Sequence, residues 1–285
     1  MAWTTSEDAP PTVRIATAIN ALQPSERRVL ELVAASPEVV VESTAQQVAD
    51  RVGVGRASVV RACQSIGYRG YPQLRVALAA ELGRHAPPAD FGPSALGRIR
   101  ADVAAVADAL PQITSVLDEG SVEAALTALT GAHRLLVLAN GLSAPLASDL
   151  AMRLTAVGRA ADSIADSIGQ QIAARQLGAD DVAVIVSGSG ANDLSLKVAR
   201  AAKQGAARVV ALTSFTDSPL VALADISLVV APASTTFRSE LEHTSRIALL
   251  VLVESLVEIV ASRTGDAALR AQTQVLEVLS DNLSD

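Results

Sequence analysis

The chain has 285 residues, of which 50% are hydrophobic, and its 23 lysines and arginines against 30 aspartates and glutamates give a net charge of −7. This composition excludes a largely disordered chain, because disorder needs low hydrophobicity together with high net charge. One cysteine and three histidines exclude a disulfide framework and a Cys/His-rich metal cluster. The N-terminus has no basic region followed by an apolar run, and the most apolar stretch, 247–260, contains two glutamates. We therefore expect a cytoplasmic protein with neither a signal peptide nor a membrane span, and without a metal or cofactor.

The first 85 residues are predicted to be all-helical. Apolar periodicity and proline or glycine boundaries predict five helices, at Thr12–Leu22, from Pro24 onward, at Ala45–Val52, at Arg56–Ile66 and from Pro72 to Leu82. A proline-rich stretch at 86–94 indicates a linker, and residues 95–118 are predicted to form a further helix.

Two of these helices, 45–52 and 56–66, have the spacing of a helix-turn-helix. Ala49 is small where two helices touch closely, and Gly53, four residues later, supplies the positive φ that a tight turn requires. Residues 44–75 hold five arginines and one acid, a local net charge of +4. Such a basic face is the electrostatic footprint of a nucleic-acid site, whereas the alternative is a helical hairpin with solvated arginines.

In a helix-turn-helix the second helix enters the major groove, where its first side chains face base edges. The polar residues of helix 56–66 are therefore our candidates for base contacts: Arg56, Ser58, Arg61 and Gln64. Two arginines beyond that helix are predicted to contact phosphates: Arg69 and Arg75.

From residue 134 the chain changes to a strand–loop–helix rhythm. Short apolar runs predict strands at Leu135–Ala139, Arg159–Ile164, Val182–Val186, Arg208–Thr213 and Ile226–Val230, of which the second has the weakest pattern. Helices are predicted at about 145–157, 167–177, 192–204, 218–223 and 241–263, with one more at 266–285. This alternation predicts an α/β doubly wound parallel sheet, which has the strand order 2-1-3-4-5 if it is flavodoxin-like.

Two loops of this α/β part join a strand to a helix through small and polar residues. They are 140–143, Asn-Gly-Leu-Ser, and 187–192, Ser-Gly-Ser-Gly-Ala-Asn. Small residues let backbone N–H groups approach an anion, hydroxyls add donors, and a helix N-terminus favours negative charge. In the flavodoxin order both loops flank the switch point, where ligands bind. The predicted ligand-binding residues are Asn140, Gly141, Ser143, Ser187, Gly188, Ser189, Gly190 and Asn192.

Neither loop has a more specific nucleotide motif. The third glycine of the dinucleotide fingerprint is missing after Gly188 and Gly190, and the alternative is that each loop is an ordinary helix cap. A third segment, 239–246, places Glu240, Glu242 and His243 before the last long helix, where they have the chemistry to move protons on a sugar. An acid-rich first helical turn explains the same residues, so we predict no catalytic residue and keep Glu240 as a ligand-binding candidate.

The order of these motifs resembles that of the RpiR/MurR-type bacterial transcriptional regulators, which join an N-terminal helix-turn-helix domain to a C-terminal sugar isomerase (SIS) domain. The matching stretches are 49–61, 66–74, 186–190, 202–206, 211–225 and 245–246. The resemblance implies a DNA-binding domain at 12–84, a linker and connecting helix at 85–118, an SIS domain at 119–263 and a C-terminal helix at 264–285.

The resemblance also implies that a phosphosugar binds with its phosphate on the hydroxyls of Ser143, Ser187 and Ser189. Two residues depart from the family pattern: Asn192 stands where many SIS loops have threonine, and Gly55 stands where the recognition helix usually begins with serine.

We therefore expect a regulator that binds double-stranded operator DNA as a homodimer or a dimer of dimers and senses a phosphosugar. One alternative is a phosphosugar isomerase that uses Glu240, Glu242 or His243, and another is an SIS scaffold that binds no ligand. The basic helix-turn-helix disfavours the isomerase, and the intact Gly/Ser loops disfavour the scaffold.

Overall fold

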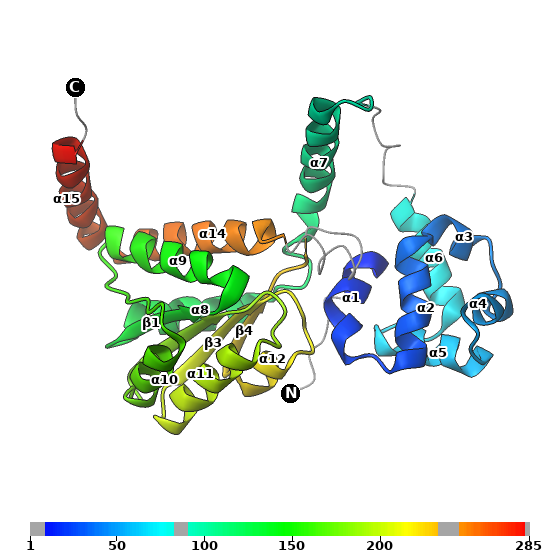
Figure 1. The fold of residues 1–285 in the computed structure, drawn as a ribbon, viewed down its shortest axis with the longest axis horizontal. Coiled ribbons are helices and arrows are strands. Elements are labelled where there is room, and N and C mark those ends of the chain that lie inside the picture. The colour runs from blue at the N-terminus through cyan, green and yellow to red at the C-terminus, as the bar shows by residue number, and fades with distance from the viewer. Residues whose placement is uncertain (1–8, 83–90, 233–244, 283–285) are drawn as a thin grey trace. The chain divides into compact units, whose positions relative to one another are not determined.

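The computed structural model describes residues 9–82, 91–232 and 245–282 and divides into two compact units (Figure 1). The first unit contains the described residues up to Val116, with short segments from later in the chain. The second contains most of the chain from Leu117 onward. The first unit is helical up to Val116 and the second is an α/β unit, as the sequence predicts.

All five helices predicted for the first 85 residues are confirmed. They are α1 (Pro11–Ala18), α2 (Pro24–Ala35), α4 (Ala45–Val52), α5 (Arg56–Ser65) and α6 (Tyr71–Leu82). A sixth, α3 (Pro37–Val41), was not predicted, because five residues are too few to show helical periodicity. The single hydrogen of the Tyr71 hydroxyl is shared between the carbonyl oxygens of Val40 at 2.7 Å and Ser43 at 2.9 Å, which fixes this helix.

The connecting helix predicted at 95–118 ends early, and a helix that was not predicted follows it. Helix α7 (Ala95–Ala109) ends in a short 3₁₀ turn, Leu110–Gln112, instead of running on to residue 118. Asp118 then begins α8 (Glu119–Gly131), and its carboxylate accepts a hydrogen bond from the backbone N–H of Ser121 at 2.9 Å. This N-cap separates α8 from the preceding chain.

Four parallel strands form the sheet, in the order β1 (Leu135–Ala139), β2 (Val182–Val186), β3 (Arg208–Thr213) and β4 (Ile226–Val229). The strand predicted at Arg159–Ile164 is wrong, because it forms only an isolated bridge between Asp162 and Leu136. The segment nevertheless lies beside β1, so the flavodoxin-like winding is retained.

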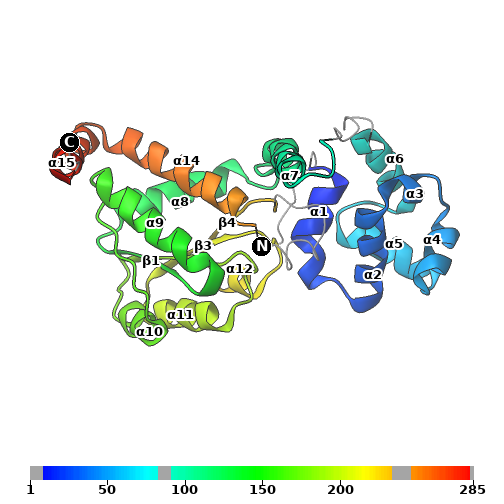
Figure 2. The same ribbon diagram turned by 45° about the horizontal axis from the view of Figure 1, so that its top comes forward.

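Helices cover both faces of the sheet. One face carries α10 (Ser167–Arg175), α11 (Asp193–Gln204) and α12 (Pro219–Leu223), packed on alternate residues of β1, β2 and β3. The other carries α8 and α9 (Ala144–Ala156), and α14 (Ile247–Thr264) runs beside α9 (Figures 1 and 2). An ion pair of 3.4 Å between Arg153 and Glu254 joins α9 to α14. Helix α15 (Asp266–Asn282) follows and packs on α9.

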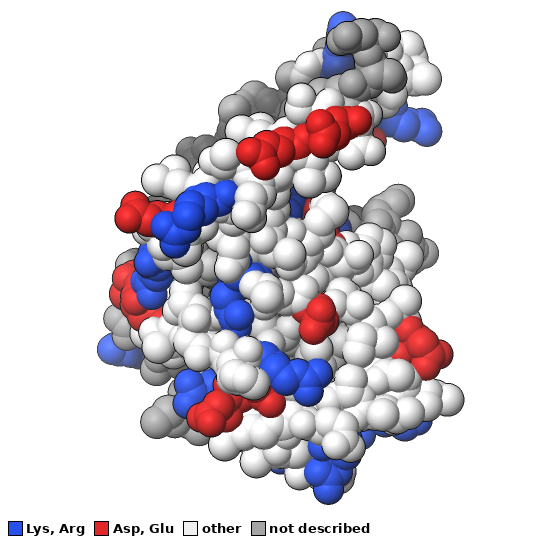
Figure 3. All heavy atoms as spheres, turned by 90° about the vertical axis from the view of Figure 1, so that its left-hand side faces the viewer, with Lys and Arg blue, Asp and Glu red and all other residues white. Residues whose placement is uncertain are grey.

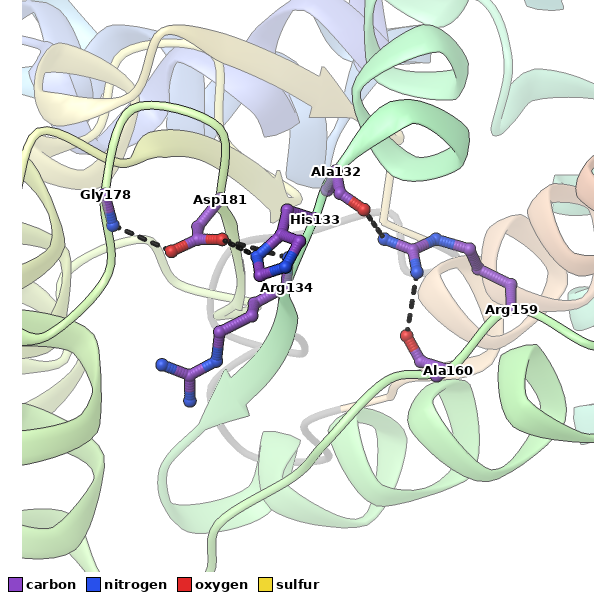
Figure 4. Close-up of polar contacts among 7 residues, drawn as sticks. All are labelled: Ala132, His133, Arg134, Arg159, Ala160, Gly178 and Asp181. Atoms are coloured by element: carbon purple, nitrogen blue, oxygen red, sulfur yellow. Dashed lines mark hydrogen bonds and ion pairs between the residues drawn. The ribbon is translucent and has the colours of Figure 1, made fainter.

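A polar cluster ties the amino ends of β1 and β2 to the end of α8 (Figure 4). The buried Asp181 carboxylate accepts hydrogen bonds from the backbone N–H of Gly178 at 2.8 Å and of Arg134 at 3.0 Å, and it lies 3.4 Å from His133 Nδ1. These interactions, led by the Gly178 bond, lower the pKa of Asp181. The cluster lies at the amino ends of the strands, and the two glycine-containing loops lie at the opposite, carboxyl ends. We therefore assign the cluster a structural role.

Arg159 stabilises the C-terminus of α8 in the same cluster (Figure 4). Its guanidinium donates to the carbonyl oxygens of Leu129 at 2.6 Å and Ala132 at 2.7 Å. A cation at this end of a helix complements the unpaired carbonyls and the helix dipole. Burial lowers the pKa of Arg159.

Candidate functional site

The turn between α4 and α5 has the geometry that the sequence predicts. Gly53 ends α4 in the left-handed conformation, with φ 70°, and Ala49 is fully buried between the helices. At the start of α4, the Thr44 hydroxyl accepts from the Gln47 N–H at 3.3 Å, and the Gln47 side-chain carbonyl accepts from the Thr44 N–H at 2.8 Å. This reciprocal capping box fixes the first helix of the helix-turn-helix.

One face of α5 is exposed and polar. Arg56, Arg61 and Gln64 lie on it, and within the described part of the chain the side chains of Arg56 and Gln64 have no hydrogen-bond partner. Gly55 precedes the helix without a side-chain cap. A helix that presents such a face is suited to enter a DNA groove.

Ser58 does not lie on this exposed face. It is buried, and its hydroxyl accepts a hydrogen bond of 2.9 Å from Arg61 Nη2, while Arg61 Nε lies 3.7 Å from Glu26 Oε1 of α2. The Ser65 hydroxyl also donates to Glu26, at 3.0 Å. Ser58 and Glu26 are therefore placed to orient the Arg61 guanidinium, a role that differs from the base contact predicted for Ser58.

Arg69 and Arg75 lie beyond α5 and are both exposed, Arg69 in the turn and Arg75 on α6. The Gln73 side chain accepts a hydrogen bond of 2.7 Å from the Arg69 N–H, which fixes that turn. Both positions suit contacts to a phosphate backbone flanking the groove.

The charge of the α/β unit is distributed differently. On the face that Figure 3 shows, which is the left-hand side of Figure 1, basic and acidic side chains are interspersed between uncharged areas. Ion pairs link Arg153 to Asp149 at 2.8 Å and Arg263 to Glu123 at 2.7 Å. The local basic excess of residues 44–75 has no counterpart on this face.

The two glycine-containing loops of the α/β unit lie against each other at the carboxyl ends of β1 and β2. The Gly188 N–H donates a hydrogen bond of 3.3 Å to the Ser143 hydroxyl. Ser143 and Ser187 are buried and Ser189 is half-buried. Within the described residues the Ser187 hydroxyl has no hydrogen-bond partner. The structure thus brings Ser143 of the first loop against Gly188 of the second, between Ser187 and Ser189 in sequence.

Contacts with residues 213–220 hold the backbone of the loop 187–192 in place. Gly190 has φ 62°, and a Cβ at this position would lie 2.5 Å from the Ser218 Cβ and 3.0 Å from Thr213 Oγ1. The Gly190 carbonyl accepts from the Leu220 N–H at 2.9 Å, and the Gly188 carbonyl accepts from the Ser214 N–H at 3.1 Å. These contacts fix the backbone of the loop, in which the Gly190 N–H donates to the Ser187 carbonyl oxygen at 3.0 Å.

Next to the two loops, hydrogen bonds connect the side-chain amides of Gln170 and Asn140 and the hydroxyl of Ser195. The Gln170 side-chain nitrogen donates to the carbonyl oxygens of Ala139 at 2.9 Å and Ile164 at 2.7 Å. Its oxygen accepts from the Asn140 side-chain nitrogen at 3.0 Å, and that nitrogen also lies 3.4 Å from Ser195 Oγ. The sequence analysis missed Gln170 and Ser195, although Gln170 shares the inner face of α10 with Ala174.

Asn192 begins α11, where the sequence predicts the end of the ligand loop. Its side-chain oxygen accepts from the Ser195 N–H at 3.1 Å, so it serves as the N-cap. Glu240 lies outside the described residues, as do Glu242 and His243. In the part of the chain that the structure describes, no helix is long and apolar enough to cross a membrane, and no three metal-ligating side chains come together.

The fold defines a class of protein in which a helix-turn-helix unit is joined to a doubly wound α/β unit. Family models match both parts: a helix-turn-helix domain of the rpiR family at residues 12–85 and an SIS domain at 128–257. An HTH-type transcriptional regulator of Caldanaerobacter subterraneus subsp. tengcongensis is 27% identical over 90% of this chain and 92% of its own length. The chain belongs to the RpiR family of regulators and is a helix-turn-helix transcriptional regulator with an SIS domain.

Two further proteins are similar to this chain. The structure of Vibrio vulnificus NanR complexed with ManNAc-6P has a TM-score of 0.60 and 23% identity, covering 96% of this chain and 100% of that one, and it shows the shared fold. The bifunctional protein glk of Paraburkholderia xenovorans is 31% identical over 86% of this chain, but the match spans only 39% of that protein.

Proposed function

We propose that this regulator senses a phosphosugar in the crevice between loops 140–143 and 187–192. The observation that carries the proposal is the hydrogen bond between the Gly188 N–H and the Ser143 hydroxyl, which brings the two loops together. Phosphate oxygens accept from hydroxyls and backbone N–H groups, and the N-termini of α9 and α11 both begin at these loops. The hydroxyls of Ser143, Ser187 and Ser189 hold the phosphate, and the amide side chains of Asn140 and Asn192 lie where the sugar begins.

The DNA-binding part of the proposal rests on the exposed face of α5. Arg56, Arg61 and Gln64 contact base edges, and Arg69 and Arg75 contact phosphates on either side of the groove. Residues 12–84 form the DNA-binding domain and 119–263 the sensor, linked by 85–118 and followed by the C-terminal helix. A homodimer or a dimer of dimers would match a palindromic operator, because closed twofold symmetry is the commonest arrangement of oligomers.

We propose further that the protein regulates and does not catalyse. A phosphosugar isomerase needs both an acid for ring opening and a base at the sugar carbons. The regulator names of relatives that match nearly the whole chain support regulation. Robust interconversion of hexose or amino-sugar phosphates by the purified protein, lost in Glu240→Gln or Glu242→Gln, would establish the isomerase instead.

Thermal unfolding of the full protein with a panel of phosphosugars tests the sensor, because a ligand that binds the folded state raises its apparent stability. The panel includes ManNAc-6P, the ligand named for the NanR structure. We expect at least one member to raise the midpoint, and we expect Ser187→Ala and Ser189→Ala each to weaken its binding by roughly ten- to a hundred-fold. Ser163→Ala, at an exposed serine of the same unit, is the matched control. No stabilisation by any phosphosugar would refute the proposal.

A further inference from the structure

Gln170 is a deeply buried polar side chain near the proposed site, with 1% of its surface exposed. The atom that lies 2.9 Å from the Ala139 carbonyl oxygen and 2.7 Å from the Ile164 carbonyl oxygen must be a donor, because carbonyl oxygens only accept. That atom is therefore the amide nitrogen, and both of its hydrogens are used. The amide oxygen of Gln170 is left to face Asn140.

The orientation of the Asn140 amide follows from that of Gln170. The Asn140 atom 3.0 Å from Gln170 Oε1 must be its nitrogen, and the second hydrogen of that nitrogen points to Ser195 Oγ at 3.4 Å. Asn140 Oδ1 has no hydrogen-bond partner within the described residues and belongs to a half-buried side chain at the end of β1. Asn140 thus presents an acceptor to the proposed site.

Hydrogen bonds from Ser195 orient the Asn192 amide in the opposite way, because they engage its oxygen. The Ser195 hydroxyl donates to Asn192 Oδ1 at 3.4 Å, and the Ser195 N–H donates to the same oxygen at 3.1 Å. With its oxygen engaged, Asn192 retains a side-chain nitrogen without a partner among the described residues. Asn192 thus presents a donor.

We propose that Gln170 determines the sugar specificity of this site by fixing Asn140 as a hydrogen-bond acceptor, with Asn192 as the opposing donor. This inference rests on the proposed phosphosugar function and adds to it the chemistry of recognition. The preferred sugar carries a hydroxyl or N–H group that donates to Asn140 Oδ1, and an oxygen that accepts from Asn192 Nδ2. Gln170 is a positioning residue, because it acts through Asn140 and lies too deep to touch the sugar.

The energetic reason is that a fixed, partly buried acceptor discriminates strongly. A ligand without a donor at that place leaves Asn140 Oδ1 unpaired and loses binding, whereas an Asn140 amide that can rotate accepts either partner. Phosphate binding is different, since it uses the hydroxyls and backbone N–H groups of the loops. Loss of Gln170 therefore separates sugar preference from phosphate affinity, which a general disturbance of the fold would not do.

The test compares Gln170→Met with Gln171→Met in the full protein. Gln171 is the adjacent half-buried glutamine, and among the residues that the structure describes its amide bonds only to the Ser167 carbonyl of its own helix, at 3.0 Å. Dissociation constants are measured for inorganic phosphate and for the 6-phosphates of glucose, fructose, mannose, N-acetylglucosamine and N-acetylmannosamine. The readout is the ratio of the constant for inorganic phosphate to that for the best sugar phosphate, which is insensitive to the fraction of folded protein.

We expect Gln170→Met to reduce this ratio by about tenfold while the affinity for inorganic phosphate stays within about twofold, and we expect Gln171→Met to change neither. Asn140→Leu removes the acceptor itself and should reduce the ratio in the same way, which keeps the inference testable if Gln170→Met unfolds. An unchanged ratio in either Gln170→Met or Asn140→Leu overturns the inference and leaves the proposed function standing. If wild-type protein binds none of the six probes, the proposed function fails and the inference fails with it.

Discussion

Gly190→Ala is expected to disrupt the second loop. Two costs combine: a non-glycine residue at φ 62° costs about 1–2 kcal/mol, and overpacking of a filled space costs about 1–3 kcal/mol. The new methyl would overlap Ser218, whose Cβ lies 2.5 Å away and cannot rotate aside. We therefore expect a loss of roughly 2–5 kcal/mol in the free energy of unfolding of the α/β unit.

Gly141→Ala is the matched control. Gly141 has the same φ of 62°, but nothing lies within 4 Å of its Cβ position, so only the backbone cost of about 1–2 kcal/mol applies. The double variant Gly190→Ala/Ser218→Gly should recover most of the steric part. Urea unfolding of the full protein, followed by circular dichroism, measures all three variants. Equal losses in Gly190→Ala and Gly141→Ala would refute the close packing of Ser218 against the loop.

Three further predictions concern other parts of the molecule. In gel-shift assays Arg56→Ala should cost about 1–3 kcal/mol and relax sequence preference, whereas Arg75→Ala should weaken all sequences alike and reduce the salt slope by about one; equal effects of both would contradict the assignment. The pKa of Asp181 is lowered from its ordinary 3.8, so its stabilisation is present above that pH and is lost as the pH falls through the folded value. Asp181→Asn should therefore make the free energy of unfolding depend less on pH as the pH falls below 3.8. An unaltered acid unfolding transition would argue against this role of Asp181. Burial raises the pKa of Cys63 to about 12, so the native thiol should resist a thiol reagent at pH 8 and react only after unfolding, whereas rapid labelling of folded protein would show that it is accessible.

The elements that could be predicted from the sequence are those with a local cause. The bounds of β1, β2 and β3 are as predicted. Strands β1 and β2 are continuous apolar runs buried on both faces, and β3 is apolar and buried between Arg208 and Thr213. Gly53 was predictable because the tight turn between two helices needs a positive φ at one position. The segment 159–164 contains one large apolar residue, Ile164, and at the sheet edge it pairs through a single bridge.

What could not be predicted depends on contacts between distant parts of the chain. Gln170 and Asn140 are 30 residues apart, and only the placement of α10 on the sheet brings their amides together. The position of Ser58 in the second helix predicts a contact in the DNA groove. In the fold its hydroxyl instead bonds to Arg61, whose guanidinium also lies beside Glu26 of α2. Gln170 and Ser58 are polar residues that the fold buries. A sequence pattern does not distinguish a buried polar residue from an exposed one.

The central claim is that a phosphosugar bound in the α/β unit changes the affinity of the helix-turn-helix for operator DNA. Titration of the full protein with the stabilising phosphosugar, in the presence and absence of operator DNA, tests this claim most directly. The two states must differ in ligand affinity by the same factor by which the ligand changes DNA affinity, and typical coupling of about 1–3 kcal/mol corresponds to roughly 5- to 150-fold. We predict equal factors in this range from both titrations. Identical ligand affinity with and without operator would contradict the claim.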